Sequence, residues 1–181
     1  MDPLISDRII LRRWREADRE PFARINADPA VMEFYRAPLS TEESNAMIDR
    51  AEAHFEQHGF GPWAAELRST GECIGYIGLM VPRFEAPFTP CVEIGWRLAA
   101  EHWGKGLATE GAREALRYGF EVLALEQILS FAVPTNMRSR RVMEKLGMTY
   151  DPGADFDHPS LPEGHPLRRH VLYRLQRRAR P

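Results

Sequence analysis

The chain has 181 residues, of which 44% are hydrophobic and 28% are charged, and its formal net charge is −2. This length and apolar content suit one globular domain over residues 1–181, and a charge near zero excludes a general electrostatic attraction to nucleic acid. No stretch is apolar for long enough to cross a membrane, and the early charges of Asp2, Asp7 and Arg8 interrupt any signal-peptide core. We therefore expect a cytoplasmic protein without nucleic-acid or membrane partners.

The first predicted elements are a short strand over 9–14, where β-prone residues cluster, and a helix over 16–26, where apolar residues follow helical spacing. A second helix begins at Ser40 or Thr41, since either residue can cap it, and it ends before Gly59. The chain thus opens with one strand and two helices.

A three-stranded antiparallel meander is predicted next. Alternation over 61–68, a turn at 69–72 and an apolar run over 73–80 indicate a hairpin. After a proline-rich connection at 82–90, a third strand covers 91–98.

The second half of the chain indicates a parallel crossover. A helix opening at Thr109 leads to an apolar strand over 127–133, a helix over 136–146, and terminal strands at 148–150 and 170–175. These elements predict an α+β (α/β) fold, with one domain and a mixed central sheet of about seven strands flanked by helices.

Cysteine and histidine spacing does not indicate a metal site. Cys73 and Cys91 are far apart and form no C-x-x-C pair, so neither a disulfide framework nor a zinc knuckle is predicted. His158, His165 and His170 are irregularly spaced in a proline-rich loop, which matches no metal-ligand pattern.

The glycine-rich segment 102–110 joins the third meander strand to the next helix. Free backbone N–H groups at a helix N-terminus attract anions, so we predict a phosphate site there. A Walker loop is excluded because Lys105 is followed by Gly106 instead of Ser or Thr, and a dinucleotide fingerprint is excluded because its third glycine is missing. A tight turn without a ligand is the alternative for this motif alone.

In its wider context, this loop resembles that of the GCN5-related N-acetyltransferase (GNAT) superfamily, in the branch of the ribosomal-protein N-acetyltransferases. The family's pyrophosphate loop, Gln/Arg-x-x-Gly-x-Gly/Ala, falls on residues 103–108, where Trp103 departs from the consensus but the glycine and alanine positions are kept. The resemblance covers most of the chain. Its motifs are Leu11-Arg12, Glu93-Ile94-Gly95-Trp96, the segment 102–110, Asn136-x-x-Ser139 and Leu146-Gly147-Met148.

The resemblance implies acetyl-coenzyme A (acetyl-CoA) as co-substrate, with its pantetheine arm between two splayed parallel strands, those of Glu93 and Ile128. One or two of the basic residues in the helix over 136–146 are expected to meet the 3′-phosphate. The cofactor-binding residues that we expect are Trp96, Arg97, Leu98, Trp103, Gly104, Lys105, Gly106, Leu107, Ala108, Thr109, Asn136 and Arg141.

Acetyl transfer from a thioester to an amine needs a neutral amine. A free α-amine titrates near ~8 and a lysine near ~10.4, so an N-terminal amine needs only a modest base acting through water. Glu93 points away from the face of Ile94 and Trp96 and lies beside the splay, so it is the first candidate for this base. Glu66, on a neighbouring strand, is the second. An ordinary ion-paired carboxylate is the alternative for each.

The departing thiolate also needs stabilisation. Related enzymes often place a tyrosine in the helix after the central strand, but alignment from Asn136 puts Met143 at that position. The resemblance offers Ser139 as a substitute that steadies the sulfur by ~1.5–3 kcal/mol, while Asn136 holds the pantetheine. A Ser139 hydroxyl bonded to its own backbone is the alternative.

The predicted function is an N-acetyltransferase that moves an acetyl group from acetyl-CoA to a primary amine by direct attack in a ternary complex. The acceptor is either a protein N-terminus or a small-molecule amine, with determinants expected in 28–58, 82–90 and 151–169. A non-catalytic acyl-CoA sensor is the alternative, because the tyrosine is missing. The proline-rich loops further suggest a homodimer contact.

Overall fold

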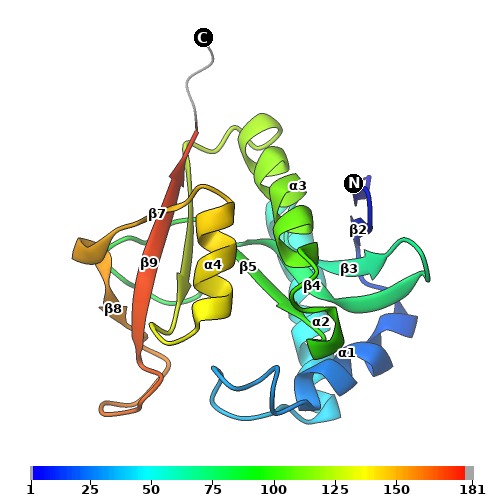
Figure 1. Ribbon diagram of the computed structural model, residues 1–181, viewed down its shortest axis with the longest axis horizontal. Coiled ribbons are helices and arrows are strands. Elements are labelled where there is room, and N and C mark those ends of the chain that lie inside the picture. Colours follow the sequence, from blue (N-terminus) through cyan, green and yellow to red (C-terminus); the bar gives the residue numbers. More distant parts are fainter. Residues whose placement is uncertain (1, 178–181) are drawn as a thin grey trace.

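A nine-stranded mixed sheet organises the computed structural model, which describes residues 2–177 (Figure 1). Its strand order is β1-β2-β3-β4-β5-β6-β9-β7, and β8 pairs with β9 off this path. The strands are β1 (Leu4–Ile5), β2 (Ile9–Arg12), β3 (Pro62–Leu67), β4 (Glu72–Met80), β5 (Glu93–Leu98), β6 (Gln127–Ala132), β7 (Thr149–Tyr150), β8 (Phe156–Asp157) and β9 (Arg169–Gln176). The predicted α+β class is confirmed. The strand count exceeds the predicted seven because β1 and β8 have two residues each, too few for a periodic pattern.

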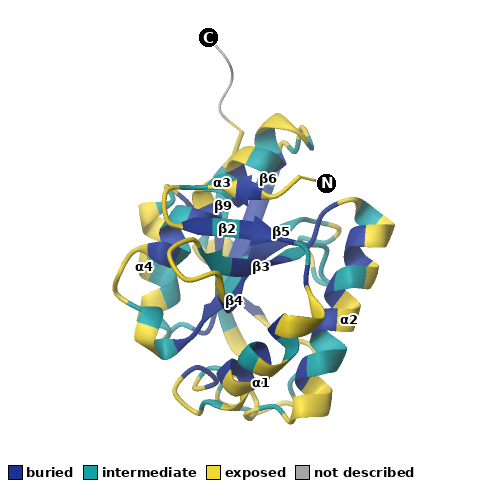
Figure 2. Cartoon of the chain, turned by 90° about the vertical axis from the view of Figure 1, so that its right-hand side faces the viewer, coloured by how far each residue is buried: buried dark blue, intermediate teal, exposed yellow. Residues whose placement is uncertain are grey.

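Four α-helices cover the sheet, and short 3-10 turns lie at Glu16–Asp18, Ala100–His102 and Pro152–Ala154. The helices are α1 (Arg19–Ala27), α2 (Thr41–His58), α3 (Leu107–Glu121) and α4 (Met137–Lys145). Figure 2 shows the buried residues concentrated in the strands and the exposed ones along the outer sides of the helices. Across residues 2–177, no helix combines the length and apolar character that crossing a membrane requires.

The two faces of the sheet are covered by different helices. Helix α3 approaches closely at Gly111, where a Cβ atom would lie 2.6 Å from the Cδ1 atom of Ile77. On the other face, α1 packs against β4, and Asn26 of α1 accepts a hydrogen bond from the guanidinium of Arg97 on β5 at 2.5 Å. The central strands are therefore buried on both faces.

The predicted ends of α2 are confirmed by its caps. The Ser40 hydroxyl accepts a hydrogen bond from the Glu43 N–H at 3.2 Å, and the Glu43 carboxylate accepts one from the Ser40 N–H at 2.8 Å. Gly59 ends the helix in the left-handed conformation, with φ of 74°. Local capping chemistry thus fixes both boundaries.

Strands β5 and β6 run parallel and then diverge. A single residue pair, Glu93 with Leu129, is in register between them. The Leu129 N–H donates to the carbonyl of Val92 at 2.9 Å, and further along the Ser130 hydroxyl donates to the carbonyl of Ile94 at 2.9 Å. A side chain thus replaces the backbone ladder where the strands separate, and the splay expected between these strands is present.

Candidate active site

Two cavities meet where β5 and β6 diverge. The first, of about 280 Å³, lies between the end of β5, the glycine-rich loop and α4. The second, of about 310 Å³, lies over the start of β5, the end of β6 and residues 158–161. The five residues that line both cavities are Phe34, Tyr35, Trp96, Asn136 and Ser139. Two molecules bound in the two cavities would therefore meet at these side chains.

The glycine-rich loop has the backbone conformation of an anion site. Gly104 and Gly106 have φ of 72° and 81°, which side-chain-bearing residues adopt only with strain. Gly106 is the N-cap of α3, so the helix begins at Leu107, two residues before the predicted Thr109. The first backbone N–H groups of α3 have no partner within the helix and line the first cavity with positive potential.

Arg8, which directly precedes β2, forms hydrogen bonds to the glycine-rich loop and to the first turn of α3. Its Nη1 donates to the carbonyl of Lys105 at 3.1 Å, and its Nε donates to the carboxylate of Glu110 at 2.7 Å. Glu110 also accepts from the Arg8 backbone N–H at 2.7 Å and from the Ser6 hydroxyl at 2.8 Å. Burial alone would raise the pKa of Glu110, but these hydrogen bonds lower it. This contact, which spans about a hundred residues of chain, was not predicted.

The predicted cofactor-binding residues all line the first cavity, except Lys105. The carbonyl of Lys105 bonds to Arg8 instead. The Arg97 side chain is buried against α1, so the main chain of Arg97, and not its guanidinium, is the part that can contact a cofactor. The Trp103 indole donates to the carbonyl of Leu98 at 2.8 Å and thereby ties the loop to the end of β5.

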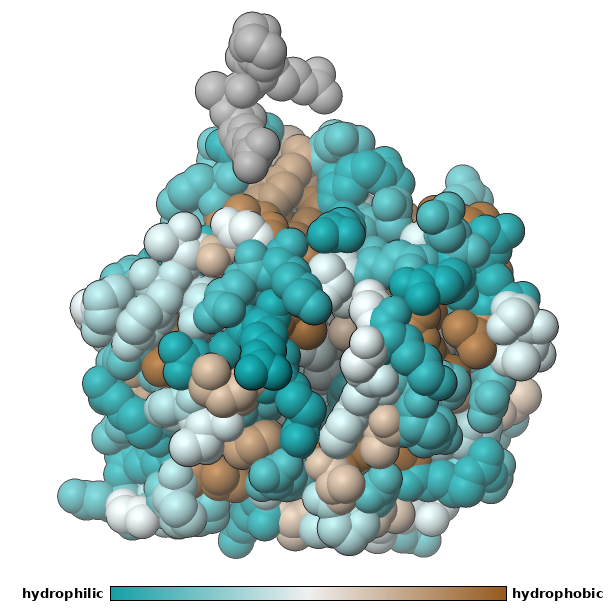
Figure 3. All heavy atoms as spheres, viewed as in Figure 1, coloured by the Kyte–Doolittle hydropathy of each residue, from teal (hydrophilic) through white to brown (hydrophobic). Residues whose placement is uncertain are grey.

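Helix α4 supplies the positive side chains of the first cavity. Arg138, Arg141 and Lys145 line it, and Figure 3 shows strongly hydrophilic side chains gathered over α4. The Arg138 guanidinium lies 4.4 Å from the centroid of the Trp103 ring and pairs with Glu33 at 2.5 Å. A guanidinium therefore lies beside position 103, although the consensus Gln or Arg is absent there.

Glu93 lines the second cavity as a half-buried carboxylate. Burial raises its pKa to about 8, and no hydrogen bond or ion pair from another described residue offsets this shift. Glu93 is therefore not the ordinary ion-paired carboxylate that was the alternative for it. A carboxylate with this pKa can accept a proton from an amine near neutral pH.

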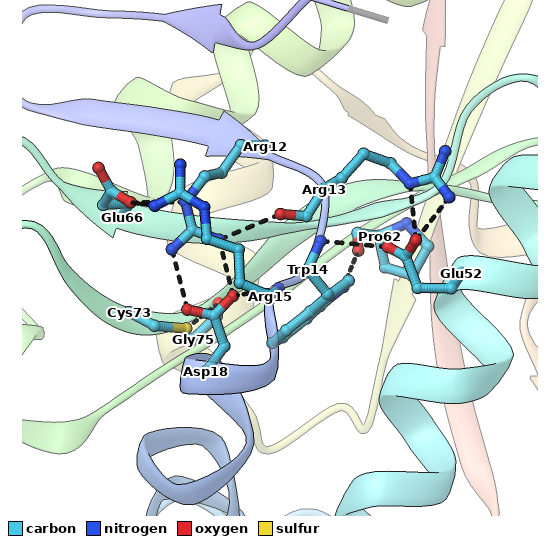
Figure 4. A network of polar contacts seen from close by, with 10 residues as sticks. All are labelled: Arg12, Arg13, Trp14, Arg15, Asp18, Glu52, Pro62, Glu66, Cys73 and Gly75. Carbon is cyan, nitrogen blue, oxygen red and sulfur yellow. Dashed lines mark hydrogen bonds and ion pairs between the residues drawn. The ribbon is translucent and has the colours of Figure 1, made fainter.

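Glu66 lies outside both cavities, in an ion-pair network (Figure 4). Arg12 donates from Nε to Glu66 at 2.5 Å and from Nη1 to Asp18 at 2.6 Å, and Arg15 pairs with Glu66 at 3.1 Å. The expectation that Glu66 lies near Glu93 is corrected here, because β4 separates β3 from β5. Glu66 has the ion-paired arrangement that was the alternative for it.

Asn136 and Ser139 form the first turn of α4. The Asn136 Oδ1 atom accepts from the Ser139 backbone N–H at 3.1 Å and caps the helix. Within residues 2–177 the Ser139 hydroxyl forms no hydrogen bond, so the alternative of a self-bonded serine is not observed. Met143 is 1% exposed and forms an apolar part of the second cavity at the position expected for a tyrosine.

Two histidines of the second cavity were considered in the sequence only as metal ligands. His158 and His170 line this cavity, and their ring centroids are 5.1 Å apart. No three His, Cys, Asp or Glu side chains in the described part of the chain gather as a metal site would require. Their proximity to the cavity depends on the pairing of β8 with β9, which residue spacing does not reveal.

Comparison with known proteins decides the family. Residues 8–149 match the sequence profile described as the acetyltransferase (GNAT) domain. The chain belongs to the GNAT superfamily. It is therefore an acetyl-CoA-dependent acyltransferase, and the predicted superfamily is confirmed.

Three relatives illustrate the similarity. The chain is 33% identical to protein YkkB of Bacillus subtilis, over 81% of this chain and 85% of that protein. It is 34% identical to the FsC-acetyl coenzyme A-N(2)-transacetylase of Aspergillus fumigatus, over 73% of this chain and 58% of that one. A crystal structure of an acetyltransferase from Agrobacterium tumefaciens superposes with a TM-score of 0.76 at 29% identity, covering 97% of this chain and 95% of that chain.

Proposed function

We propose that this protein transfers an acetyl group from acetyl-CoA, held in the first cavity, to a primary amine held in the second. The observation that carries this proposal is that the two cavities meet at Ser139 and Trp96, with Glu93 facing the second cavity. The name of the Aspergillus fumigatus relative, an acetyl coenzyme A transacetylase acting at an N(2) position, supports transfer to nitrogen.

The first cavity fits the parts of acetyl-CoA in order. The N–H groups at the start of α3 suit the pyrophosphate, and Arg138, Arg141 and Lys145 suit the remaining phosphate charge. Beyond Glu93, β5 has no β6 partner in register, and the carbonyls of Ile94 and Leu98 already accept side-chain hydrogen bonds, so the main chain of Trp96 between them is the part of this edge that suits the amides of pantetheine. When bound, the co-substrate supplies an electrophilic thioester carbonyl.

Glu93 accepts the proton of the amine, directly or through water. The neutral amine attacks the thioester carbonyl carbon, a C–N bond forms and the C–S bond breaks. The attacking nitrogen then loses a second proton to give the amide, and the Ser139 hydroxyl donates a hydrogen bond to the departing thiolate, which takes up that proton, directly or through water, to become the free thiol. Asn136 positions this turn by capping α4.

A covalent acetyl-cysteine intermediate has no support. Neither Cys73 nor Cys91 lines either cavity, and burial raises the pKa of their thiols to about 12 and about 11. Both thiols are therefore protonated near neutral pH and are weak nucleophiles. These properties of the two thiols support direct attack in a ternary complex. The cytoplasmic location and a homodimer through the proline-rich loops stay predictions.

The test is release of free coenzyme A thiol from acetyl-CoA on addition of amines, with the acetylated product identified by mass spectrometry. We expect amine-dependent release, and a strong loss of rate in Glu93→Gln. Tight acetyl-CoA binding without release across small amines and peptide N-termini would instead support the acyl-CoA sensor, which the buried Met143 favours.

A further inference from the structure

Six aromatic rings gather at one end of the second cavity. Each ring centroid lies within 6.3 Å of at least three of the others. They come from the loop over residues 82–90 and from β6, β8 and β9 and the residue after β8. The rings are those of Phe84, Phe88, Phe131, Phe156, His158 and His170.

The rings form two layers. Phe131, His158 and His170 line the cavity, whereas the other three do not and pack behind them. Phe156, in the rear layer, lies 5.3 Å from Phe131 and 5.6 Å from His170 between ring centroids. The rear layer belongs to a small hydrophobic cluster that includes Leu129. The cavity-facing rings are thus held in place before any ligand arrives.

The two histidines contribute neutral rings. Burial lowers the pKa of both side chains. The His170 Nδ1–H donates to the carbonyl of Arg168 at 3.0 Å, and the His158 Nδ1 accepts from the Ser160 N–H at 3.3 Å. Each ring therefore has one nitrogen occupied by a neutral hydrogen bond, and this end of the cavity has the character of an aromatic wall.

Charge is sparse elsewhere in the second cavity. Among the described residues that line it, Glu93 is the one acidic residue and Arg36 is the one arginine. The remaining lining includes the apolar side chains of Met80, Met143 and Leu161 and the uncharged polar side chains of Tyr35, Tyr76, Ser130, Asn136, Ser139 and Ser160. An acceptor with one amine can place it near Glu93, but a second ammonium would find no second carboxylate among the described lining residues, and the guanidinium of Arg36 would repel it.

We propose that the acceptor is a monoamine whose primary amine is joined by a short linker to an aromatic ring. The amine lies at Glu93 and the ring packs against Phe131, His158 and His170. This inference rests on the proposed function, since it places the acceptor in the second cavity. Packing of ring against ring adds to the gain from burial, and the fixed wall needs little reordering.

The test compares three amines of related size: phenethylamine, 2-cyclohexylethylamine, whose ring is saturated, and putrescine, which has a second amine. We expect kcat/KM for phenethylamine to exceed that for the cyclohexyl compound by about tenfold, the upper end of the range for aromatic pairing, and that for putrescine by more. Equal values for the two ring compounds, or a preference for putrescine, would overturn the inference.

Two variants locate the effect. Phe131→Leu removes a cavity-facing ring, so the aromatic preference should be lost while KM for acetyl-CoA is unchanged. Phe88→Leu makes the same change in the rear layer and should keep the preference. Circular dichroism checks that both variants are folded. If Phe131→Leu does not fold, the wild-type comparison of the three amines still decides.

Binding separates this inference from the proposed function. Isothermal titration of each amine into protein saturated with coenzyme A measures acceptor selection without turnover. Selective binding of phenethylamine with no acetylation of any amine would support the aromatic site and refute the transferase. Acetylation without aromatic preference would support the transferase and refute the aromatic site, and so would the absence of phenethylamine binding alongside turnover of other amines.

Discussion

Glu93→Gln tests the base assignment most directly, because the neutral amide keeps the size of the side chain and removes its titration. The Glu93 pKa of about 8 sets the size of the effect. At pH 7 about one tenth of the carboxyl groups are ionised, and at pH 6 about one hundredth. The wild-type rate should therefore rise about tenfold per pH unit up to pH ~8. Above that pH, where Glu93 is fully ionised, the Glu93→Gln variant should be slower than wild type by roughly 10²–10⁴-fold, the usual cost of losing a general base.

The assay is the ratio of wild-type to Glu93→Gln turnover between pH 6 and 9 with one amine acceptor. The acceptor is a weakly basic amine that is neutral throughout this range, so its own titration does not enter the ratio. We expect the ratio to rise about a hundredfold between pH 6 and 8 and then to level off. Glu66→Gln is the matched control: Glu66 lies outside both cavities, so its ratio should be constant once the folded fraction is corrected for.

Stability gives an independent reading of the same pKa. Glu93 has a higher pKa in the folded state than in the unfolded chain, so its ionisation disfavours folding. Wild-type stability should fall as pH rises from ~4.5 to ~8, by on the order of a few kcal/mol, and Glu93→Gln should lack this fall. A turnover ratio that does not change with pH, together with parallel urea-unfolding profiles, would refute the assignment of Glu93 as the titrating base.

Three further variants and one control address the thiolate contact, the glycine-rich loop and the buried Arg12 ion pair. Ser139→Ala should lower kcat by about tenfold, the value of one hydrogen bond to a charged sulfur, and leave the acetyl-CoA dissociation constant unchanged by calorimetry. Arg8→Ala frees a carbonyl of the glycine-rich loop and should weaken acetyl-CoA binding by about threefold, a small effect because the Arg8 side chain is 51% exposed. Asp18→Ala leaves the buried Arg12 short of a carboxylate and should cost about 3 kcal/mol in urea unfolding. Glu20→Ala, on the exposed surface, should cost less than about 0.5 kcal/mol; an equal loss in both variants would contradict the burial argument.

Local chemistry made the fold and the first cavity predictable. Ser40 and Gly59 fix the ends of α2. The glycines at 104 and 106 indicate a turn with left-handed residues, and the neighbouring motifs, Asn136 and Ser139 among them, were needed to interpret this turn as a phosphate site. The start of α3 was misplaced by two residues because its cap is Gly106 in the left-handed conformation, which has no capping side chain for a sequence pattern to detect.

Non-local pairing made the second cavity unpredictable. Glu66 and Glu93 look alike in sequence, since both are strand carboxylates. The structure treats them differently because Arg12, 54 residues away from Glu66, pairs with Glu66, whereas no basic residue within 2–177 pairs with Glu93. The histidines at 158 and 170 join the cavity only through the pairing of Phe156 with His170 in the two-residue strand β8, which is too short to be inferred from periodicity.

The position of Glu93 links the fold to the proposed chemistry. Glu93 occupies the one residue pair at which β5 and β6 are still in register, so it is partly enclosed by neighbouring strands and its pKa is raised. Two residues further along β5, on the same face, stands Gly95, where a Cβ atom would lie 2.9 Å from the Cε atom of Met80. A larger side chain there would press on a wall of the second cavity. The divergence of β5 and β6 thus leaves the poorly solvated carboxylate of Glu93 at the last residue pair that is still in register. The part of β5 that faces the acetyl donor follows directly after it, so the proposed base for the amine lies next to the proposed binding site of acetyl-CoA.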